Sequence, residues 1–546
     1  MSEDTPKQSW SMARVVTASS AGTAFEWYDF FIFGSLTPII SKVFFTGLDP
    51  TAALVAALAL FAVGFAFRPL GAILFGAMGD RIGRKATFLA TVSLMGGATF
   101  AIGLLPTYAS AGIVAPILLI ILRICQGTAL GGEYGGAAIY VAEHAPDDRR
   151  GATTGWIQSS ASFGLLAALL VIFVTRRLLG EEAFAEWGWR IPFLVSVVLL
   201  AISVWMRAKL SESPAFEKLR EEGEVSTAPL KEAFADPANL KRVAVAFFAI
   251  MCAQGAVWYF TFFYMQVFLE KSLGIPGATK DLLLIIMTVA SAPLYVLFGR
   301  LSDKVGRKPV MLAGMLLALA LYFPGSHWIA QAANPALIEA QRASPVLVYA
   351  DPATCTAQFD PTGTKKFLSG CDTAKALLVA KGVSFKTVPV GVDEAQVVIG
   401  KNRLYFPSLA DVPPALVAAE KAEATKVLTA ALEANGYPTA ADPARMNWPV
   451  LVGVLLLFVV AATALYGPQA AALVEMFPTR IRYSALSLPY HFGTGWVGGF
   501  LPFTSFAIVA ITGDIYAGLW YAVIFTAISV LTTVFFLKES AGKPIH

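Results

Sequence analysis

The stretch GDRIGRK at residues 79–85 separates two long apolar runs, and its pattern returns as SDKVGRK at residues 302–308. Asp80 corresponds to Asp303, so the two copies are 303 − 80 = 223 residues apart. Chains that cross a membrane many times are often built from two such related halves. The repeat therefore predicts two similar halves that carry this charged stretch at equivalent places.

A second repeated pattern measures an insertion in the second half. An acid, a proline and an arginine occur twice with one spacing: Glu143, Pro146 and Arg150, then Glu475, Pro478 and Arg482. This offset is 475 − 143 = 332, so 332 − 223 = 109 extra residues lie between Asp303 and Glu475. Residues 331–446 are polar and rich in proline, and we expect the insertion there.

Composition indicates that the rest of the chain lies in a bilayer. Hydrophobic residues make up 56% of the 546 residues and charged residues 14%, against about 25% charged residues in soluble domains. Apolar runs of about 20 residues are long enough to cross a membrane as helices, and they are far longer than the strands of a barrel. We predict an all-α membrane protein with twelve spans in two six-helix halves, near residues 16–41, 52–78, 87–106, 113–142, 152–175, 190–209, 243–268, 281–299, 309–330, 449–472, 484–512 and 515–537.

Charge distribution predicts the orientation in the membrane. The short loops GDRIGRK, DDRR, DKVGRK and PTRIR lie on one side and are rich in Lys and Arg, so the positive-inside rule makes both termini cytoplasmic. No removable signal peptide is evident, and we expect a multi-pass protein of a bacterial-type inner membrane. The parts are residues 1–209 (first half), 210–242 (cytoplasmic linker), 243–330 (spans seven to nine), 331–446 (insert) and 447–546 (spans ten to twelve).

The insert between spans nine and ten is predicted to be a small α/β domain outside the membrane, on the non-cytoplasmic side. VLVYA and QVVIG are typical of strands, whereas DTAKALLVAK and VPPALVAAEKAEATKVLTAALEAN are typical of helices. Cys355 and Cys371 enclose 15 residues. In an oxidising compartment a disulfide between them would stabilise the domain by about 3 kcal/mol; two free thiols are the alternative.

Several motifs resemble a known transporter family. The two repeated loops resemble the loop motif that follows spans two and eight in the major facilitator superfamily, and Arg123, Gln126 and Gly127 resemble its fourth-span motif. The stretches FEWYDFFIFG, FRPLG, QGTALGGEYGG, WGWRIPF and EMFPTRIRYSA resemble the metabolite:proton symporters, which include permeases for α-ketoglutarate, shikimate, citrate, and proline or betaine. The resemblance covers the chain except the insert, and it implies a proton-coupled secondary transporter.

Charged residues near the bilayer midplane are the main candidates for a site, because each costs about 2.5–3.5 kcal/mol in hydrocarbon. At about 1.5 Å per residue, Glu26, Arg68, Glu133 and His491 all lie near the midplane, with Asp29 beside Glu26. We expect these charges to pair around a polar cavity. Arg68 would bind a substrate carboxylate, and Glu26 or Asp29 would carry the coupled proton. The alternative is a fixed ion-pair network that holds the helices together.

Other residues at this depth have two interpretations each. Glu133 is either a proton relay or a hydrogen-bonding group in a helix contact, and His491 is either a titrating group or a helix contact. Gly127, Gly131 and Gly135 repeat every four residues, which favours close helix packing. Polar and aromatic side chains would line the cavity or simply pack: Trp27, Tyr28, Tyr134, Gln158, Gln254, Tyr259 and Tyr490.

Charges near the membrane surfaces suggest gating contacts. Arg123 would lie near the outer surface, where it either snorkels to the interface or acts in the fourth-span motif. In the loops, an aspartate would cap a neighbouring helix and arginines would pair with the acids that end spans four and ten, closing the cytoplasmic side. Simple determination of topology by positive charge is the alternative. The residues are Asp80, Arg81, Arg84, Asp303, Lys304, Arg307, Glu143, Arg150, Glu475 and Arg482.

These observations favour a symporter that imports a small organic acid or zwitterion with protons by alternating access. A facilitator or antiporter on the same fold is one alternative, and a membrane-anchored sensor or enzyme domain is another. We expect no catalytic residues, no cofactor, no metal site and no nucleic-acid partner, since no Walker motif, metal-ligand spacing or basic surface is evident. Membrane lipid, a carboxylate substrate and protons would be the partners of a functional monomer.

Overall fold

The twelve predicted spans form two helical bundles that stand side by side. The computed structural model describes residues 12–45, 60, 63–209, 212–353, 355, 368–392 and 394–544. Within these residues, ten helices are long and apolar enough to cross a membrane. α1, which carries Glu26 and Asp29, and the span that ends in α3, which begins with Arg68, bring the number to the predicted twelve. The first bundle comprises α1 (Met12–Phe44), α3 (Arg68–Ile82), α4 (Arg84–Leu104), α6 (Val114–His144), α7 (Arg150–Leu179) and α9 (Arg190–Ala208).

The second bundle is less regular than the first. Its unbroken spans are α15 (Gly277–Val305), α16 (Arg307–Ala333) and α24 (Leu519–Phe536). The other three spans are divided into shorter segments. Span seven consists of α12 (Pro237–Val245), η2 (Ala246–Met251), α13 (Cys252–Tyr259), η3 (Phe260–Tyr264), α14 (Met265–Val267) and η4 (Phe268–Ser272). Span ten consists of α20 (Trp448–Tyr466) and α21 (Gln469–Met476), and span eleven consists of η6 (Thr479–Ile481), α22 (Arg482–Phe492), η7 (Gly493–Gly498) and α23 (Leu501–Thr512).

Prolines and π-helical turns account for part of this irregularity. Pro468 lies between α20 and α21, and Pro489 lies inside α22, where it cannot donate a backbone hydrogen bond. The segments η2, η3, η4 and η7 are π-helical turns, which occur frequently at functional sites. The two helices that carry them, spans seven and eleven, pack against each other through α13 and η7.

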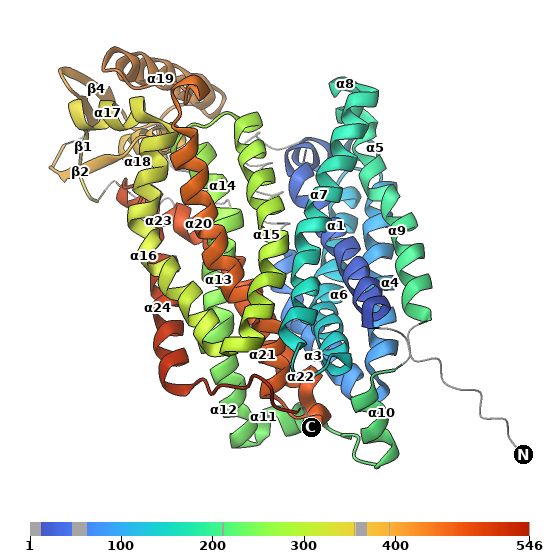
Figure 1. The fold of residues 1–546 in the computed structure, drawn as a ribbon. Helices are drawn as coiled ribbons and strands as arrows, with labels where there is room; N and C mark the ends of the chain where they lie inside the picture. The colour runs from blue at the N-terminus through green and yellow to red at the C-terminus, as the bar shows by residue number, and fades with distance from the viewer. Residues whose placement is uncertain are drawn as a thin grey trace, which may run out of the picture.

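The two halves meet along two pairs of helices. α7 packs along α15, and α3 packs along α22 (Figure 1). Val15 near the start of α1 packs with Phe88 and Tyr140, and the backbone carbonyl of Lys543 accepts a hydrogen bond from Arg150. The start of α1 and the end of the described chain therefore lie on the side of residues 79–85 and 302–308. We call this the loop side and the opposite one the insert side.

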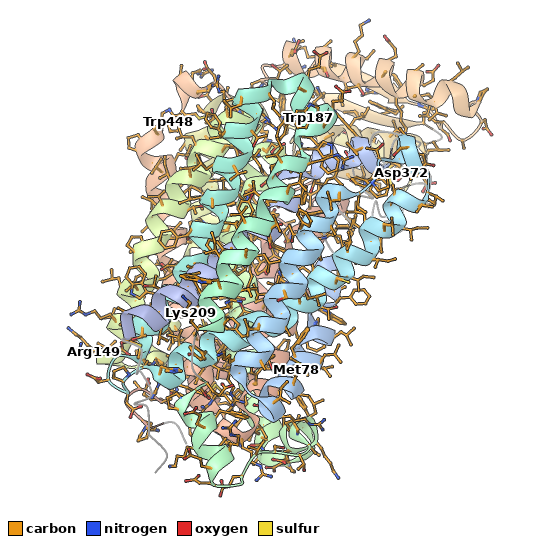
Figure 2. All side chains as sticks on the ribbon, turned by 90° about the vertical axis from the view of Figure 1, so that its right-hand side faces the viewer. Met78, Arg149, Trp187, Lys209, Asp372 and Trp448 are labelled. Carbon is orange, nitrogen blue, oxygen red and sulfur yellow. A yellow bond between two sulfur atoms is a disulfide. The ribbon has the colours of Figure 1, made fainter. Side chains whose placement is uncertain are left out.

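Short helices complete the two sides of the membrane domain. On the loop side, α10 (Pro214–Glu221) and α11 (Pro229–Ala235) belong to the linker between the halves. On the insert side, α5 (Tyr108–Ala111), α8 (Glu181–Ala183) and η1 (Phe184–Gly188) connect spans of the first half. Figure 2 shows Met78 and Arg149 toward the loop side, and Trp187, Asp372 and Trp448 at the opposite end. The insert and the positively charged loops thus lie on opposite sides.

The insert is a four-stranded sheet with helices. Its strands are β1 (Val346–Ala350), β2 (Phe385–Pro389), β3 (Ala395–Ile399) and β4 (Asn402–Phe406), in the order β2-β1-β3-β4. β1 pairs with β2 in parallel and with β3 antiparallel, and β3 pairs with β4 antiparallel. The helices are α17 (Pro335–Ala343), α18 (Gly370–Ala380) and α19 (Pro414–Ala434), and the 3-10 turn η5 (Pro443–Arg445) leads into α20.

Half of the insert's strands lie where the sequence predicts them. β1, β3, α18 and α19 coincide with the predicted segments, whereas β2, β4 and α17 were not predicted. β2 and β4 are edge strands, which carry more polar residues than central strands: Lys386 and Pro389 occur in β2, and Arg403 occurs in β4. The apolar alternation that identifies β1 and β3 is therefore interrupted in their outer neighbours.

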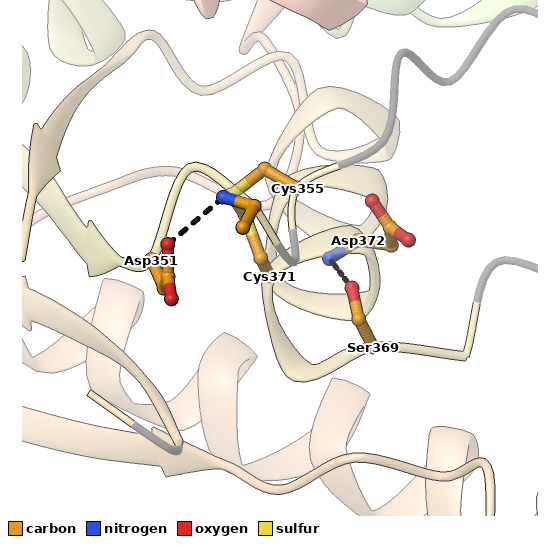
Figure 3. Close-up of a disulfide and its surroundings, with 6 residues drawn as sticks. Asp351, Cys355, Ser369, Cys371 and Asp372 are labelled. Atoms are coloured by element: carbon orange, nitrogen blue, oxygen red, sulfur yellow. Dashed lines mark hydrogen bonds between the residues drawn. A yellow bond between two sulfur atoms is a disulfide. The ribbon is translucent and has the colours of Figure 1, made fainter. Parts of the chain in front are cut away.

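The predicted disulfide is confirmed. Cys355 and Cys371 are bonded, with Cα atoms 5.2 Å apart. Figure 3 shows the bond beside the start of α18, where the Ser369 hydroxyl accepts a hydrogen bond from the backbone N–H of Asp372. The disulfide therefore ties the segment after β1 to a capped helix.

The insert is attached to the second half. The backbone N–H of Phe385 in β2 donates to the carbonyl of Gly513 at the end of α23, at 2.9 Å. Close to the end of span seven, the carbonyl of Leu273 accepts from the Asn334 side chain, and that of Gly274 accepts from the backbone N–H of Ala441. These bonds join the insert to the ends of spans seven, nine and eleven.

Candidate functional site

Arg68, the first residue of α3, is buried without an acidic partner. Its side chain is 2% exposed, and Nε and Nη2 have no hydrogen-bond partner among the described residues. The guanidinium lies over the rings of Phe30 and Phe65, at 4.9 and 4.3 Å from their centroids, and beside the Tyr259 hydroxyl. A permanent charge in this position could bind an anion, since its planar fork has donors that are unused among the described residues.

The aromatic rings around Arg68 continue into a cluster that joins the two halves. Trp27 of α1 lies 6.2 Å from Trp258 of α13, between ring centroids, and Trp258 lies 5.9 Å from Tyr466 of α20. The Trp258 indole N–H donates to the Tyr295 hydroxyl at 2.8 Å. Aromatic faces attract cations. The site therefore places an anion-binding group beside rings suited to a positive charge.

Asp29 and Arg123 belong to one polar network in the first half. Arg123 donates to Gln126 at 2.8 Å, and Gln126 donates to Thr99 at 2.7 Å. Asp29 lies beside Thr99, with Oδ1 unpaired among the described residues. Arg123 is 1% exposed and lies over the Phe33 ring at 4.0 Å, so it does not snorkel to the surface, and that alternative is wrong.

Glu26 does not pair with Arg68, so the expectation of one mutual ion-pair network is wrong. Its carboxylate lies 2.8 Å from Arg207 of α9, and Arg207 lies over the Phe88 ring at 3.6 Å. Both side chains are almost fully buried. The reason is the direction of α9, which runs toward the loop side and so brings Arg207, near its end, beside the loop-side half of α1. Glu26 is thereby neutralised within the first half.

His491 of α22 is a second buried polar group without a hydrogen-bond partner among the described residues. Its ring is 1% exposed, neither ring nitrogen has a hydrogen-bond partner among the described residues, and Arg68 is the charge that acts on it. The Tyr490 ring stands edge-on to it, 4.9 Å away between centroids. The hydrogen-bonded helix contact considered for His491 is therefore not what the structure contains.

On the loop side, Asp80 joins α3 to the other half. Its carboxylate accepts hydrogen bonds from the backbone N–H groups of Tyr483 and Ser484, at 3.2 and 2.8 Å, in the first turn of α22. It also lies 3.1 Å from Arg84. Glu143, at the end of α6, lies 2.6 Å from Arg482 of the second half. An acid at a helix N-terminus and a buried ion pair thus close this interface.

The same contacts occur at the pseudo-equivalent place. Asp303 accepts from the backbone N–H groups of Gly151 and Ala152, both at 2.8 Å, in the first turn of α7. Arg307 lies 2.6 Å from Asp303 and 3.1 Å from Glu475, and Arg150 lies 2.8 Å from Glu475. At each of the two interfaces, an aspartate caps a helix of the opposite half and an ion pair joins the two halves. The loop side is therefore closed in this structure.

A sequence profile of the Major Facilitator Superfamily matches residues 20–338. The chain belongs to the Major Facilitator Superfamily. The family resemblance predicted from the loop motifs is thereby confirmed, and a multi-pass membrane protein follows from it.

Two relatives and one solved structure illustrate this superfamily membership. The proline/betaine transporter of Salmonella typhimurium is 36% identical over 320 residues, which cover 57% of this chain and 64% of the relative. The inner membrane metabolite transport protein YhjE of Escherichia coli is 36% identical over 347 residues, covering 62% and 76%. The proton:xylose symporter XylE, bound to 6-bromo-6-deoxy-D-glucose, has a TM-score of 0.61 at 17% identity, covering 98% and 97%, and shares the fold.

The alignment spans a little under two thirds of the first of these relatives. This superfamily member differs from a simple twelve-span arrangement by the insert, which occupies the region between α16 and α20.

Three of the residues predicted to line the cavity form hydrogen bonds with other residues of the protein. Tyr28 points away from Arg68, because its hydroxyl donates to the Pro192 carbonyl of α9 at 2.9 Å. Gln158 donates to the Tyr466 carbonyl across the halves at 3.1 Å, and the Tyr490 hydroxyl lies 3.3 Å from that of Tyr466. Tyr28 is therefore a structural residue of the first half, and the prediction that it lines the site is wrong.

The remaining predicted wall residues lie closer to the site or outside the described part. Trp27 and Tyr259 belong to the aromatic cluster, and Gln254 is buried with Oε1 unpaired among the described residues. The side chains of Glu133 and Tyr134 lie outside the described residues. Sequence reasoning missed Trp258, Phe30 and Phe65, because the sequence does not show which aromatic residues of an apolar run face the site and which only pack.

The glycine repeat of α6 is a packing surface, as the sequence favours. A Cβ added at Gly127 would overlap the backbone of Gly64 in the span before α3, and one at Gly131 would overlap the carbonyl of Arg68. A Cβ at Gly135 would meet the Ser487 hydroxyl of α22. These glycines let α6 approach close enough to hold Arg68 in place.

Two further acids on the loop side were not predicted. Glu212 accepts hydrogen bonds from the backbone N–H groups of Arg84 and Lys85, at 3.0 and 3.2 Å, and caps α4. Glu539 does the same for α16, accepting from Arg307 and Lys308 at 2.9 and 3.0 Å. The signal was present, since the pattern Leu-x-Glu-Ser ends both the sixth and the twelfth spans, at residues 210–213 and 537–540.

The pKa of the Glu539 carboxyl reflects this capping role. Burial acts to raise the pKa, but hydrogen bonds from the backbone N–H groups of residues 541, 307, 308 and 540 outweigh burial and hold it below its ordinary value. The carboxylate form is therefore bound more strongly in the folded protein than in the unfolded chain.

The linker also contacts the second half. Glu232 of α11 accepts two hydrogen bonds from Arg480, at 2.8 and 3.1 Å, and this bond lowers the pKa of Glu232. Arg81 donates to the Thr227 carbonyl of the linker at 2.8 Å, whereas Lys304 is exposed. Arg81 therefore holds the linker, and the described structure gives Lys304 no gating contact.

Among the described residues, no group of three or more His, Cys, Asp and Glu side chains is arranged to hold a metal ion.

Proposed function

We propose that this chain is a symporter that imports a small zwitterionic carboxylate together with protons by alternating access, and that Arg68 binds the carboxylate. The observation that carries the proposal is the uncompensated charge of Arg68, 2% exposed, with two donor nitrogens unpaired among the described residues. Burying a charge without a partner is strongly unfavourable. A bound carboxylate would remove this penalty and use the free donors in a bidentate pair.

The surroundings of Arg68 favour a zwitterion over a simple acid. Trp27, Trp258 and Tyr466 lie in one cluster with centroid distances of 6.2 and 5.9 Å. Rings of this kind attract an ammonium group by about 0.5–2 kcal/mol each. The similarity to proline/betaine transporters supports such a solute.

The loop-side contacts support alternating access. Asp80 and Asp303 each bond the first turn of a helix in the opposite half, and these bonds must break for the loop side to open. The two halves would rotate about the midplane site, with the loop side facing the cytoplasm by the positive-inside rule. A single chain would be sufficient for this motion, because both halves belong to it.

The proposal is tested in proteoliposomes with the purified chain. Labelled proline and glycine betaine are offered under an imposed pH gradient, with and without a protonophore. We expect accumulation that the protonophore abolishes, and loss of uptake in Arg68→Lys, because an ammonium cannot reproduce the guanidinium fork. Arg300→Lys, at an exposed position of α15, is the matched control. Normal uptake by Arg68→Lys would refute the carboxylate site, and uptake insensitive to the protonophore would indicate a facilitator.

A further inference from the structure

Two groups that can be positive face each other at the midplane without a counter-ion among the described residues. Arg68 comes from α3 of the first half, and His491 comes from α22 of the second half; these helices pack against each other. Both side chains are at most 2% exposed, and both have nitrogens without a partner in the described part of the chain. Arg68 is the charge that acts on the His491 ring.

We propose that His491 carries the transported proton, and that it takes up this proton only when a substrate carboxylate lies between its ring and Arg68. The inference rests on the proposed function and names the coupling group of the same site. Among the candidates whose side chains are described, position favours His491, since Glu26 is paired with Arg207 and Asp29 lies in the Arg123 network.

The coupling follows from charge alone. Without substrate, a proton on His491 would place two positive charges together in a water-poor site, where repulsion is strong. A carboxylate between them turns that repulsion into two attractions, so the substrate and the proton bind together. Linkage makes the effect reciprocal, because a protonated His491 strengthens carboxylate binding by the same factor.

The other groups around His491 do not replace Arg68 in this role. α3 contributes Asp80, but that carboxylate is bonded to Arg84 and to the start of α22. Span seven contributes the neutral side chains of Gln254 and Tyr259, and η7 contributes glycine backbone. α6 contributes Glu143, which is paired with Arg482, and Glu133, whose side chain lies outside the described residues.

The face of α22 that carries His491 also provides a route for release of the proton. Ser487, four residues before His491 and therefore on the same face of α22, is fully buried, and its hydroxyl, unpaired among the described residues, lies against Gly135 of α6. Below it, the backbone N–H of Ser484 bonds to Asp80. When α22 separates from α3, water reaches His491 along this face. The proton then passes from the ring nitrogen to water on the loop side, and no bond of the substrate changes.

The test compares two transport modes in proteoliposomes that contain the purified chain. The first mode is accumulation of labelled proline driven by a pH gradient, and the second is exchange of labelled for unlabelled proline at equal pH. Exchange needs substrate binding and rocking but no net proton release. In His491→Gln we expect accumulation to fall to equilibrium while exchange persists at a reduced rate, because the amide keeps a hydrogen-bonding group but cannot take up a proton.

Two other variants make the result specific. His327→Gln changes an exposed histidine of α16 that stacks on Tyr516, and both transport modes should be unchanged. Asp29→Asn removes the competing carrier and should retain gradient-driven accumulation. Retained accumulation in His491→Gln would overturn the inference, as would loss of accumulation with retained exchange in Asp29→Asn alone.

A second measurement uses the unchanged protein. Proline added to the purified chain in weak buffer should withdraw about one proton per bound solute, as read by a pH indicator, because binding and protonation are linked. No proton uptake by wild type would overturn the inference. If wild type shows no proton-driven uptake at all, the proposed function fails as well; if wild type is coupled and His491→Gln remains coupled, only the inference fails.

Discussion

Replacing Asp80 with Asn should open the loop side. The carboxylate is 1% exposed and accepts two backbone hydrogen bonds from α22, in the opposite half, while it lies 3.1 Å from Arg84. An amide has nearly the same shape, but it has one acceptor oxygen and no charge. The variant therefore loses one bond between the halves and weakens the other.

The size of the effect can be worked out from these contacts. A hydrogen bond to a charged group contributes about 1.5–3 kcal/mol, and a neutral one about 0.5–1.5 kcal/mol. Losing one charged bond and neutralising the second destabilises the closed state by about 3 kcal/mol. Since about 1.4 kcal/mol is a factor of ten, the ratio of loop-open to loop-closed protein should rise about 100-fold. Asp303→Asn should act equally, because Asp303 makes two bonds of the same kind to α7.

The assay is a distance distribution between spin labels on the two halves. Labels at Ile82 of α3 and Lys241 of α12 are exposed, and they lie on opposite sides of the interface between α3 and α22. The free cysteines Cys125 and Cys252 are replaced first. In Asp80→Asn we expect the longer-distance population to grow at the expense of the shorter one.

A control separates this mechanism from loss of a surface charge. Asp281→Asn removes an acid whose side chain is 64% exposed and that pairs only with Lys280 among the described residues. It should leave the distances unchanged. An unaltered distance distribution in Asp80→Asn, at unchanged folding, would contradict the role of the two backbone bonds in closure.

Two further predictions concern the insert and the loop side. Cys355→Ser should destabilise the insert by about 3 kcal/mol, the value for a loop of this length. Backbone hydrogen exchange in the sheet should therefore become faster in Cys355→Ser, and it should be unchanged in the control Cys125→Ser. The pKa of Glu539 is held below its ordinary value, so its stabilisation is complete above the usual glutamate range and is lost as pH falls through the lowered pKa. The difference in melting temperature between wild type and Glu539→Gln should accordingly be constant near neutral pH and shrink in acid; a difference that persists unchanged in strong acid would contradict the capping role.

The fold could be predicted because membrane spans and repeats leave strong marks in a sequence. The lengths of the apolar runs predicted the spans, the motif around Asp80 and Asp303 predicted the two halves, and the different offset of the motif at Glu143 and Glu475 predicted the size of the insert. The π-helical turns and the division of spans seven, ten and eleven were not predictable in this way. They depend on how neighbouring helices pack, as for Gly495 in η7, where an added Cβ would lie 3.1 Å from the Phe65 carbonyl oxygen and 4.0 Å from Arg68 Cδ.

The site could be predicted only in part, for a related reason. Depth along each helix brings Glu26, Asp29, Arg68 and His491 to one level, but it does not say which way each side chain points. Arg207 lay outside the set because it is close to the loop-side end of its predicted span, and yet it takes Glu26 as its partner. Helix rotation, which hydropathy does not determine when every face is apolar, decided the pairing.

The internal repeat also tests whether the charge at the midplane is a requirement of the fold. By the offsets of the two motifs, Arg68 corresponds to residue 68 + 223 = 291, a serine, and His491 to residue 491 − 332 = 159, also a serine. At this second interface Ser291 bonds to Ser162 at 2.8 Å, and Ser159 donates to the Ala292 carbonyl at 2.7 Å. Where α7 meets α15, small neutral side chains thus have hydrogen-bond partners across the interface. The same architecture closes without any charge there, whereas the loop-side acids and arginines are present in both copies. Packing of this architecture therefore does not require Arg68 and His491. This supports the proposal that their nitrogens, unpaired among the described residues, bind a carboxylate and a proton.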